Sequence, residues 1–301
     1  MKILIAGATG LIGSELTKQC LAGGIGVNYL TTSKDKIWDR PNHKGFYWDP
    51  NKGRVDAAAF MGVTAVINLA GASIAKKWDR AEKEKILQSR VQSANCIYNF
   101  LKTNKTGVSH YISASGASIY PNSKTKLYHE GYDGVDSTFL ANVVVAWEAA
   151  ADKFKTLNIA VAKVRTGVVI AKKDSVLQKM ATPIKKGFGA VLGSGKQWLS
   201  WVHVYDIAGV YLHILKKGLS GVYNGVAPNP VTNKKMTHCI ADIEKKSIFL
   251  PKVPGFIVRL LLGEMAVLAL KGQLVSSRKI QDSGYGFRFI KLEAALRDLL
   301  Y

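Results

Sequence analysis

Cysteine is scarce in this chain, and its cysteines lack the spacing of a metal site or a disulfide framework. Only Cys20, Cys96 and Cys239 occur among the 301 residues. A disulfide-stapled secreted domain and a metal centre are therefore not expected, and a reducing cytoplasm is the expected location. Apolar runs long enough for a signal peptide or a transmembrane segment are also missing, so neither is predicted.

Acidic residues are scarce as well. The chain has 21 Asp and Glu against 42 Lys and Arg, a formal charge of +21. Such an excess attracts polyanions, yet the lysines are spread along the chain in pairs, and no basic run or nucleic-acid motif occurs. We expect no specific nucleic-acid partner, only a basic surface that also attracts phosphorylated ligands. The pairs include Lys76-Lys77, Lys172-Lys173, Lys185-Lys186 and Lys216-Lys217.

The strongest motif lies at the N-terminus, in MKILIAGATGLIG. An apolar run at residues 3–5 is typical of a buried parallel strand, and an amphipathic helical pattern begins at Leu11. Between them, Gly7 permits a tight turn, Gly10 lets the backbone approach a pyrophosphate, and Gly13 lets the helix pack closely. The helix N-terminus then offers free N–H groups to the phosphates. Dinucleotide binding is predicted. The alternative is a turn that only lets the helix pack on the sheet.

The residues after the second expected strand bear on the choice between NAD and NADP. An Asp or Glu at the end of this strand would bond the ribose 2′-hydroxyl and favour NAD. Here Thr31, Thr32, Ser33 and Lys34 follow, and the first carboxylate is Asp35. Hydroxyl groups and a lysine suit a 2′-phosphate better, so NADP is predicted and NAD is the less favoured cofactor. The alternative is an ordinary polar loop.

Strands and helices alternate through much of the chain, which predicts an α/β fold with a parallel sheet. Asp79 and Asp206 are expected helix caps, and the alternation breaks from Ala171 to about residue 200. Strands are expected near 3–5, 27–30, 46–48, 63–69, 111–115, 159–164 and 221–225, and helices near 11–20, 79–102 and 139–155 and from about 206, 232 and 291.

The apolar stretch after Pro251 is interrupted by Arg259 and Glu264. It is too short and too charged for a transmembrane helix. We expect a buried or domain-contacting helix there, with an interfacial helix on a membrane as the alternative.

Two polar positions near the expected sheet edge are candidates for function. Ser115 ends the strand at 111–115, where a hydroxyl can bond a substrate carbonyl or satisfy a nearby backbone group. Arg90 lies near the inner face of the helix at 79–102. It either snorkels or is directed at a cofactor phosphate.

Together these motifs resemble those of the extended short-chain dehydrogenases/reductases in the NAD-dependent epimerase/dehydratase superfamily. More narrowly, the chain resembles a subfamily of epimerase family proteins with a C-terminal domain of unknown function. The resemblance covers nearly the whole chain. It rests on the glycine motif, Asn68 to Gly71, Ser113 to Ser115, Trp147-Glu148, Arg165 to Val169, Trp201 to Asp206, Asn224 to Pro228 and Leu262 to Glu264.

The resemblance implies a Rossmann doubly wound parallel sheet with a smaller C-terminal substrate domain. The expected NAD(P)-binding domain spans residues 1–226, with a substrate-domain insertion at about 171–200, and the C-terminal domain spans 248–298. A homodimer is one option. Cofactor-binding positions implied by the motifs are Gly7, Thr9, Gly10, Leu11, Ile12, Gly13, Thr31, Thr32, Leu69, Ala70, Gly71 and Arg90.

The chain departs from the superfamily pattern where catalysis is expected. Short-chain dehydrogenases use Ser with a Tyr and a Lys four residues apart on the next helix. Here the two helix positions are Leu140 and Val144, neither of which titrates. Ser115 remains a catalytic candidate, and Tyr120 or a water would replace the missing acid.

A second departure bears on the substrate. Sugar-nucleotide epimerases often carry Arg-Asp where this chain has Leu199-Ser200, and that arginine grips the diphosphate. A nucleotide sugar is therefore a less favoured substrate. The leading hypothesis is an NADP-dependent oxidoreductase acting on an unknown small carbonyl or alcohol. The alternatives are a catalytically weak NADP-binding sensor or partner-binding protein, and a nucleotide-sugar epimerase or dehydratase.

Overall fold

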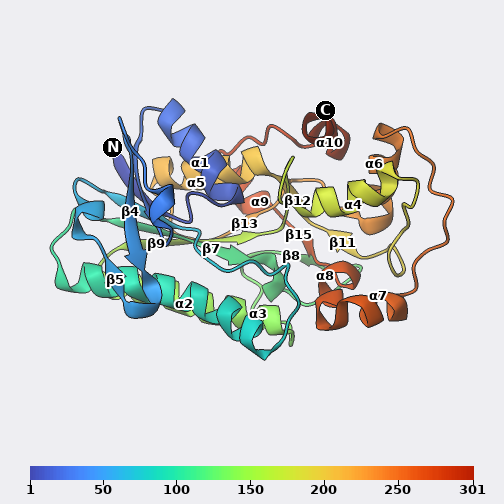
Figure 1. The fold of residues 1–301 in the computed structure, drawn as a ribbon, viewed down its shortest axis with the longest axis horizontal. Helices are drawn as coiled ribbons and strands as arrows, with labels where there is room; N and C mark the ends of the chain where they lie inside the picture. The colour runs from blue at the N-terminus through green and yellow to red at the C-terminus, as the bar shows by residue number, and fades with distance from the viewer.

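A mostly parallel sheet lies at the centre of the computed structural model, which describes residues 1–301 (Figure 1). Only β3 and β5 run antiparallel to their neighbour β4. The prediction of an α/β Rossmann fold is confirmed. The strands, in sheet order, are β13 (Gly221–Gly225), β9 (Ala160–Thr166), β7 (His110–Gly116), β6 (Ala65–Asn68), β1 (Lys2–Ala6), β2 (Gly26–Thr31), β4 (His43–Asp49) and β3 (Asp39–Arg40), with β5 (Arg54–Val55) paired to β4.

The order of the strands reverses at β1, which lies between β2 and β6. From β1 the chain first builds the sheet through β2 and β4, and then returns to build the other half from β6. The connections that leave β1 and β6 therefore separate at their carboxyl ends and leave a crevice, where open α/β sheets bind ligands. This places the glycine motif beside the loop that follows β6.

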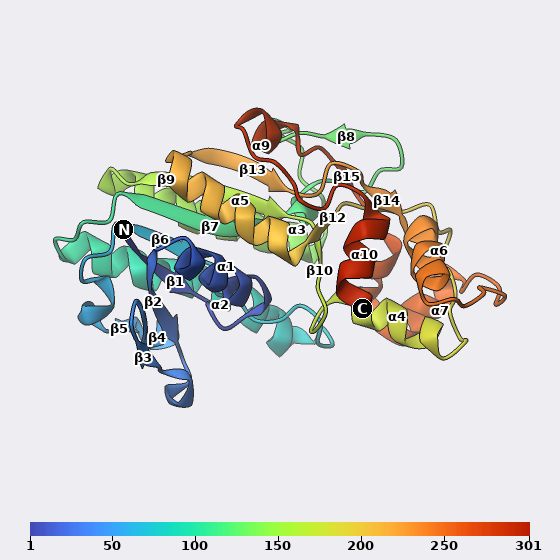
Figure 2. The ribbon, with the colours of Figure 1, turned by 90° about the horizontal axis from the view of Figure 1, so that it is seen from above.

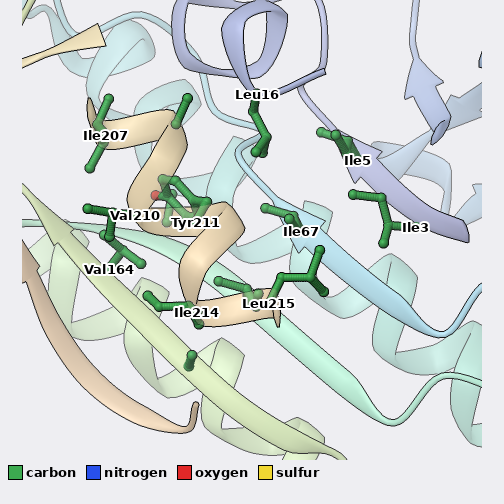
Figure 3. Packing of buried hydrophobic residues seen from close by; sticks show 14 of the residues in the cluster. Ile3, Ile5, Leu16, Ile67, Val164, Ile207, Val210, Tyr211, Ile214 and Leu215 are labelled. Atoms are coloured by element: carbon green, nitrogen blue, oxygen red, sulfur yellow. The ribbon is translucent and has the colours of Figure 1, made fainter. Parts of the chain in front are cut away.

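Helices cover both faces of the sheet. Helices α1 (Leu11–Ala22) and α5 (Val204–Lys217) lie on one face, and α2 (Arg80–Thr103) and α3 (Phe139–Asp152) lie on the other (Figures 1 and 2). The apolar residues of α5 recur at helical spacing and point into the core against β1, β6 and β9, as Figure 3 shows. They are Ile207, Val210, Tyr211, Ile214 and Leu215.

The expected helix caps are partly confirmed. The Asp79 carboxylate accepts a hydrogen bond from the Glu82 amide at 2.8 Å, so it caps α2 as predicted. The prediction for Asp206 is wrong. Strand β12 (Trp201–His203) runs directly into α5, so the cap falls on His203, whose Nδ1 accepts from the Tyr205 amide at 3.0 Å. Asp206 lies in the first turn and binds the C-terminal segment instead.

The segment where the alternation breaks contains a helix that the sequence analysis did not predict. Helix α4 (Val176–Lys185) is capped by Ser175 and packs with α6 (Asn233–Ile243) and α10 (Leu292–Leu300) around a separate apolar cluster (Figure 2). Short elements complete this half of the molecule. They are β8 (Leu127–Tyr128), β10 (Val168–Ile170), β11 (Trp198–Leu199), β14 (Val231–Thr232), β15 (Leu274–Val275) and α9 (Arg278–Asp282).

The prediction of a buried helix after Pro251 is wrong for α7 (Gly255–Leu262), but the stretch does contact the rest of the protein, because Met265 and Val267 pack against the cluster that contains Trp78 and Leu140. Within this helix only Val258 is buried, while Leu260 is 83% exposed and Leu261 is 76% exposed. Apolar side chains occur on all sides of α7. The side that includes Val258 therefore packs against the protein, while apolar side chains on the other sides face solvent. Helix α8 (Val267–Leu270) follows it. None of the helices combines the length and hydropathy needed to span a membrane.

Candidate functional site

The glycine turn has the geometry predicted for the first and third glycines. Gly7 adopts φ +84°, and a Cβ there would lie 2.8 Å from the Leu69 carbonyl carbon. A Cβ on Gly13 would lie 2.1 Å from the Gly7 carbonyl oxygen, so helix α1 packs on the turn only because residue 13 is glycine. Gly10 is extended and precedes α1 without a side-chain cap, which leaves N–H groups of the first turn open to a ligand.

A cavity of about 320 Å³ opens at this turn. Its floor comes from the turn and the start of α1, and its other side comes from the loop after β10. That loop contributes two exposed lysines, which place positive charge beside the helix N-terminus. The lining residues are Thr9, Gly10, Leu11, Ser14, Lys172, Lys173 and Asp174.

The end of β2 presents hydroxyl and ammonium groups. Thr31 is buried, and its Oγ1 accepts a hydrogen bond from the Ser33 amide at 3.2 Å. Thr32 and Lys34 are exposed, and the Lys34 ammonium lies 5.5 Å from the centre of the Tyr47 ring. The nearby Asp35 carboxylate accepts from the Ser33 hydroxyl at 3.1 Å. Residues 31–34 contribute no carboxylate where a ribose 2′-hydroxyl would be read.

The loop after β6 lies against the glycine turn. The Leu69 amide donates to the Ala6 carbonyl at 2.8 Å, and a Cβ on Gly71 would lie 3.0 Å from the Arg90 guanidinium carbon. Arg90 donates to the Ala72 carbonyl at 3.2 Å. Burial lowers the pKa of Arg90 to about 10, so it stays a cation at neutral pH. The predicted Arg90 is thus held beside Gly71.

The predicted cofactor-binding residues therefore meet along one edge of the sheet, at the carboxyl ends of β1, β2 and β6. The arrangement fits a dinucleotide because Gly10 and the uncapped start of α1 line a cavity that two lysines also line. Contacts between particular residues and the cofactor stay predictions.

Ser115 is part of a buried hydrogen-bond network that the sequence analysis missed. Its hydroxyl donates to Glu148 Oε1 at 2.6 Å. Glu148 also accepts two hydrogen bonds from Arg165, at 2.8 and 3.1 Å, in a bidentate ion pair. All three side chains are buried. Burial alone would raise the pKa of Glu148, but Arg165, Ser115 and Lys163 together lower it, so Glu148 is a carboxylate at neutral pH.

Tyr120 lies at the other end of this network. Its hydroxyl accepts from Arg165 Nη1 at 3.0 Å and donates to Asn224 Oδ1 at 2.8 Å. The side chain is fully buried, and burial raises its pKa despite the nearby cation. Ser115 and Tyr120 are therefore joined through Glu148 and Arg165. Their catalytic roles stay predictions.

The helix positions that hold Tyr and Lys in short-chain dehydrogenases are apolar and buried here. Leu140 packs with Trp78 and Ile86, and Val144 belongs to the cluster around Tyr120. No titratable side chain occupies either position. Hydride chemistry in this chain thus requires a proton route other than the usual Tyr and Lys pair.

Leu199 and Ser200 have structural roles in this fold. Leu199 pairs with Val231 between β11 and β14. Ser200 is buried, donates to the Gln273 carbonyl at 2.7 Å and accepts from the Val275 amide at 3.0 Å. No cation stands at these two positions to grip the diphosphate of a nucleotide sugar.

The contacts of Glu148 and Arg165 have no signal in the sequence. Both residues belong to motifs that resemble the family pattern, but nothing in the spacing of these motifs indicates that the carboxylate and the guanidinium face each other. The sequence predicts Lys172 and Lys173 only as part of the basic surface. A charged pair that follows directly on a strand end would have been the clue to its place at the phosphate turn.

The strand order, the crevice at β1 and the glycine turn define an NAD(P)-binding Rossmann protein of the short-chain dehydrogenase/reductase kind. Residues 3–225 match the model of the NAD dependent epimerase/dehydratase family. The chain therefore belongs to this family. Residues 253–299 match a domain of unknown function, DUF1731.

Similar proteins match this chain over nearly its whole length. The chain is 32% identical over 298 residues to "Epimerase family protein SAR0825" of Staphylococcus aureus, covering 99% of this chain and 98% of that protein. It superposes on the human epimerase family protein SDR39U1, crystallised with NADPH, with a TM-score of 0.86 and 29% identity, covering 99% of both chains. A nucleoside-diphosphate sugar epimerase from Corynebacterium glutamicum gives a TM-score of 0.79 and 26% identity, covering all of this chain and 58% of that one.

Proposed function

We propose that this chain binds NADP and uses it as an oxidoreductase on a small carbonyl or alcohol. The observation that carries the choice of NADP is the end of β2, where Thr32 and Lys34 are exposed and residues 31–34 include no carboxylate. The human relative that was crystallised with NADPH supports the same choice. The bound cofactor would supply or accept a hydride.

The network around Ser115 suggests which form of substrate oxygen it would hold. Its proton is committed to the Glu148 carboxylate at 2.6 Å, so its oxygen offers lone pairs rather than a donor. Such an oxygen accepts a hydrogen bond from a substrate hydroxyl, which favours the alcohol. Because Tyr120 is engaged on both sides, a water is the better candidate for moving the proton.

The two sets of basic residues have separable roles. Lys172 and Lys173 face the glycine turn, where both NAD and NADP place their pyrophosphate. Lys34 lies at the end of β2, where only NADP has a phosphate.

Charge variants test this division by titration with NADPH and NADH, followed through nicotinamide fluorescence. Lys34→Glu should weaken NADPH binding at least about tenfold and should not weaken NADH binding, because the new carboxylate repels the 2′-phosphate and can accept a hydrogen bond from a free 2′-hydroxyl. Lys172→Ala with Lys173→Ala should weaken both about equally. The matched control is Lys216→Ala with Lys217→Ala. This lysine pair lies at the far end of α5, beside Gly23. Equal losses for both cofactors in the Lys34 variant would contradict the NADP assignment.

A catalytically weak NADP-binding sensor or partner-binding protein is the second candidate. The apolar Leu140 and Val144 favour it, because they remove the usual proton donor. Ser115→Ala separates the two candidates once a substrate screen is run. An enzyme should lose substrate-dependent hydride transfer, assayed both as NADP⁺ reduction with alcohols and as NADPH oxidation with carbonyls, and keep its affinity for NADPH, whereas a sensor should turn over no substrate in the screen. A nucleotide-sugar epimerase is third, because Leu199 and Ser200 supply no cation for the diphosphate.

A further inference from the structure

The exposed apolar face of α7 is not explained by the proposed function. Phe256 and Leu260 lie one turn apart on this helix and are 68% and 83% exposed, and Leu261 beside them is 76% exposed. We call these three residues the α7 patch. The helix lies at the end of the molecule opposite the N-terminal strands, as both views show (Figures 1 and 2). Burying large apolar side chains is favourable, so a face of this kind marks a contact surface.

Free positive charge accompanies the patch. The segment from Glu244 to Glu264 contains two carboxylates, and both are already paired: Glu244 with Lys185 at 3.2 Å and Glu264 with Lys83. The basic residues of the same segment are exposed, and none is ion-paired. They are Lys245, Lys246, Lys252 and Arg259. The segment that carries the α7 patch therefore contains exposed, unpaired cations along with its exposed apolar side chains.

The combination of exposed apolar side chains and unpaired cations indicates which kind of partner the α7 patch binds. A second copy of the chain would bring the same cations face to face in a symmetric contact, in addition to the repulsion between two molecules of charge +21. An anionic bilayer complements both features, because its headgroups attract Lys and Arg and its interface accepts Phe and Leu. No helix spans a membrane, so the contact is peripheral.

We propose that α7 docks on the surface of an anionic lipid bilayer. Phe256, Leu260 and Leu261 enter the interfacial layer, while Lys252 and Arg259 lie among the lipid phosphates. The inference does not rest on cofactor binding or turnover, because α7 contributes no residue to the glycine turn or to the network around Ser115.

Vesicle sedimentation of the full chain tests the proposal. We expect binding to vesicles of phosphatidylcholine with about 30% phosphatidylserine and little binding to phosphatidylcholine alone. Leu260→Ser with Leu261→Ser should reduce binding at least about tenfold, since both contribute apolar area. These side chains are largely solvated, so the fold should survive, as circular dichroism and NADPH titration would verify. Met61→Ser is the matched control, because Met61 is 70% exposed outside this segment.

A second probe separates insertion from simple charge attraction. In Phe256→Trp, the indole fluorescence should shift to shorter wavelength on anionic vesicles and be quenched by brominated lipid chains. Vesicle binding that the two leucine changes leave intact, or an indole that stays unquenched, would show adsorption by net charge alone and overturn the proposal. Loss of a solution dimer in the leucine variant, with no vesicle binding by the wild type, would assign the patch to self-association and also overturn it.

Discussion

At the residue scale, the Glu148–Arg165 pair connects the candidate catalytic residues and is costly to break. Both side chains are buried; Arg165 has Glu148 as its ion-pair partner, while Glu148 also accepts from Ser115 and lies 3.6 Å from the Lys163 ammonium. A buried ion pair adds little stability relative to apolar packing, but removing one partner leaves an uncompensated charge. The pair therefore acts as a rigid support for Ser115 and Tyr120.

Glu148→Gln should lower the free energy of unfolding by about 3–5 kcal/mol, because it leaves the Arg165 charge buried without a partner. Urea unfolding at neutral pH measures the loss. A loss below about 1 kcal/mol, as for a surface ion pair, would contradict the buried pairing.

The pH dependence of stability gives an independent check on the same pair. The folded state lowers the pKa of Glu148, so its contribution is present above the pKa of the unfolded chain and is lost as pH falls through the folded pKa. The wild type should therefore lose more stability than Glu148→Gln on acidification below about pH 4. Parallel acid-unfolding profiles for the two proteins would count against this explanation.

Substitutions at two glycines of the turn should affect stability and cofactor binding differently. Gly13→Ala places a Cβ 2.1 Å from the Gly7 carbonyl oxygen and should lower both the melting temperature and the cofactor affinity, because α1 must move. A Cβ at Gly10 is 3.3 Å from the same oxygen, in an extended conformation open to any residue. Gly10→Val should keep most of the stability and abolish cofactor binding, because the branched side chain occupies the pyrophosphate position. Thermal melts and NADPH titration distinguish the two; unaltered affinity in Gly10→Val would be the contrary result.

Residue-level prediction worked where backbone geometry demanded one residue type. Gly7 and Gly13 were predictable because only glycine fits their close contacts. Glu148 and Arg165 were not, because they lie on different elements and only the packing of α3 against β9 brings them together.

At the element scale, α5 connects the Rossmann core to the C-terminal segment. Its inner face packs in the core, and its Asp206 carboxylate accepts hydrogen bonds from the Arg288 and Phe289 amides at 2.8 and 2.9 Å. Asp206 therefore joins α5 to the chain that leads into α10.

Asp206→Ala should cost about 2–4 kcal/mol, because two backbone amides lose their acceptor. Hydrogen exchange at Arg288 and Phe289 should accelerate before the rest of the protein opens. Asp282→Ala is the control, since its ion pair with Arg278 is exposed and should change stability by less than about 0.5 kcal/mol. Equal effects of the two substitutions would refute the joining role of Asp206.

Helices and strands with a strong apolar periodicity were predicted well. Those whose start or existence depends on neighbouring segments were predicted poorly. The central strands and helices α1, α2 and α3 follow from apolar patterns in the sequence. Helix α4 was missed because a Lys- and Gly-rich background and Pro183 obscured its pattern. The start of α5 was misplaced because His203 ended a strand and capped a helix at once.

At the scale of the whole molecule, the fold was predictable and the substrate was not. Alternating elements and one glycine motif define a doubly wound sheet, and its topology alone places the binding crevice at β1. The substrate depends on side chains gathered from segments far apart in the sequence, such as those that join Ser115 and Tyr120 through Glu148 and Arg165. The domain boundaries, a homodimer and a cytoplasmic location stay predictions.

The measurement that tests the central claim most directly is a side-by-side titration of the wild-type protein with NADPH and NADH, followed by nicotinamide fluorescence. The account predicts that NADPH binds at least about tenfold more tightly, a difference of about 1.4 kcal/mol. That preference would come from the 2′-phosphate at Thr32 and Lys34. Equal affinities, or tighter binding of NADH, would contradict the NADP assignment, and failure to bind either would contradict the proposed function as a whole.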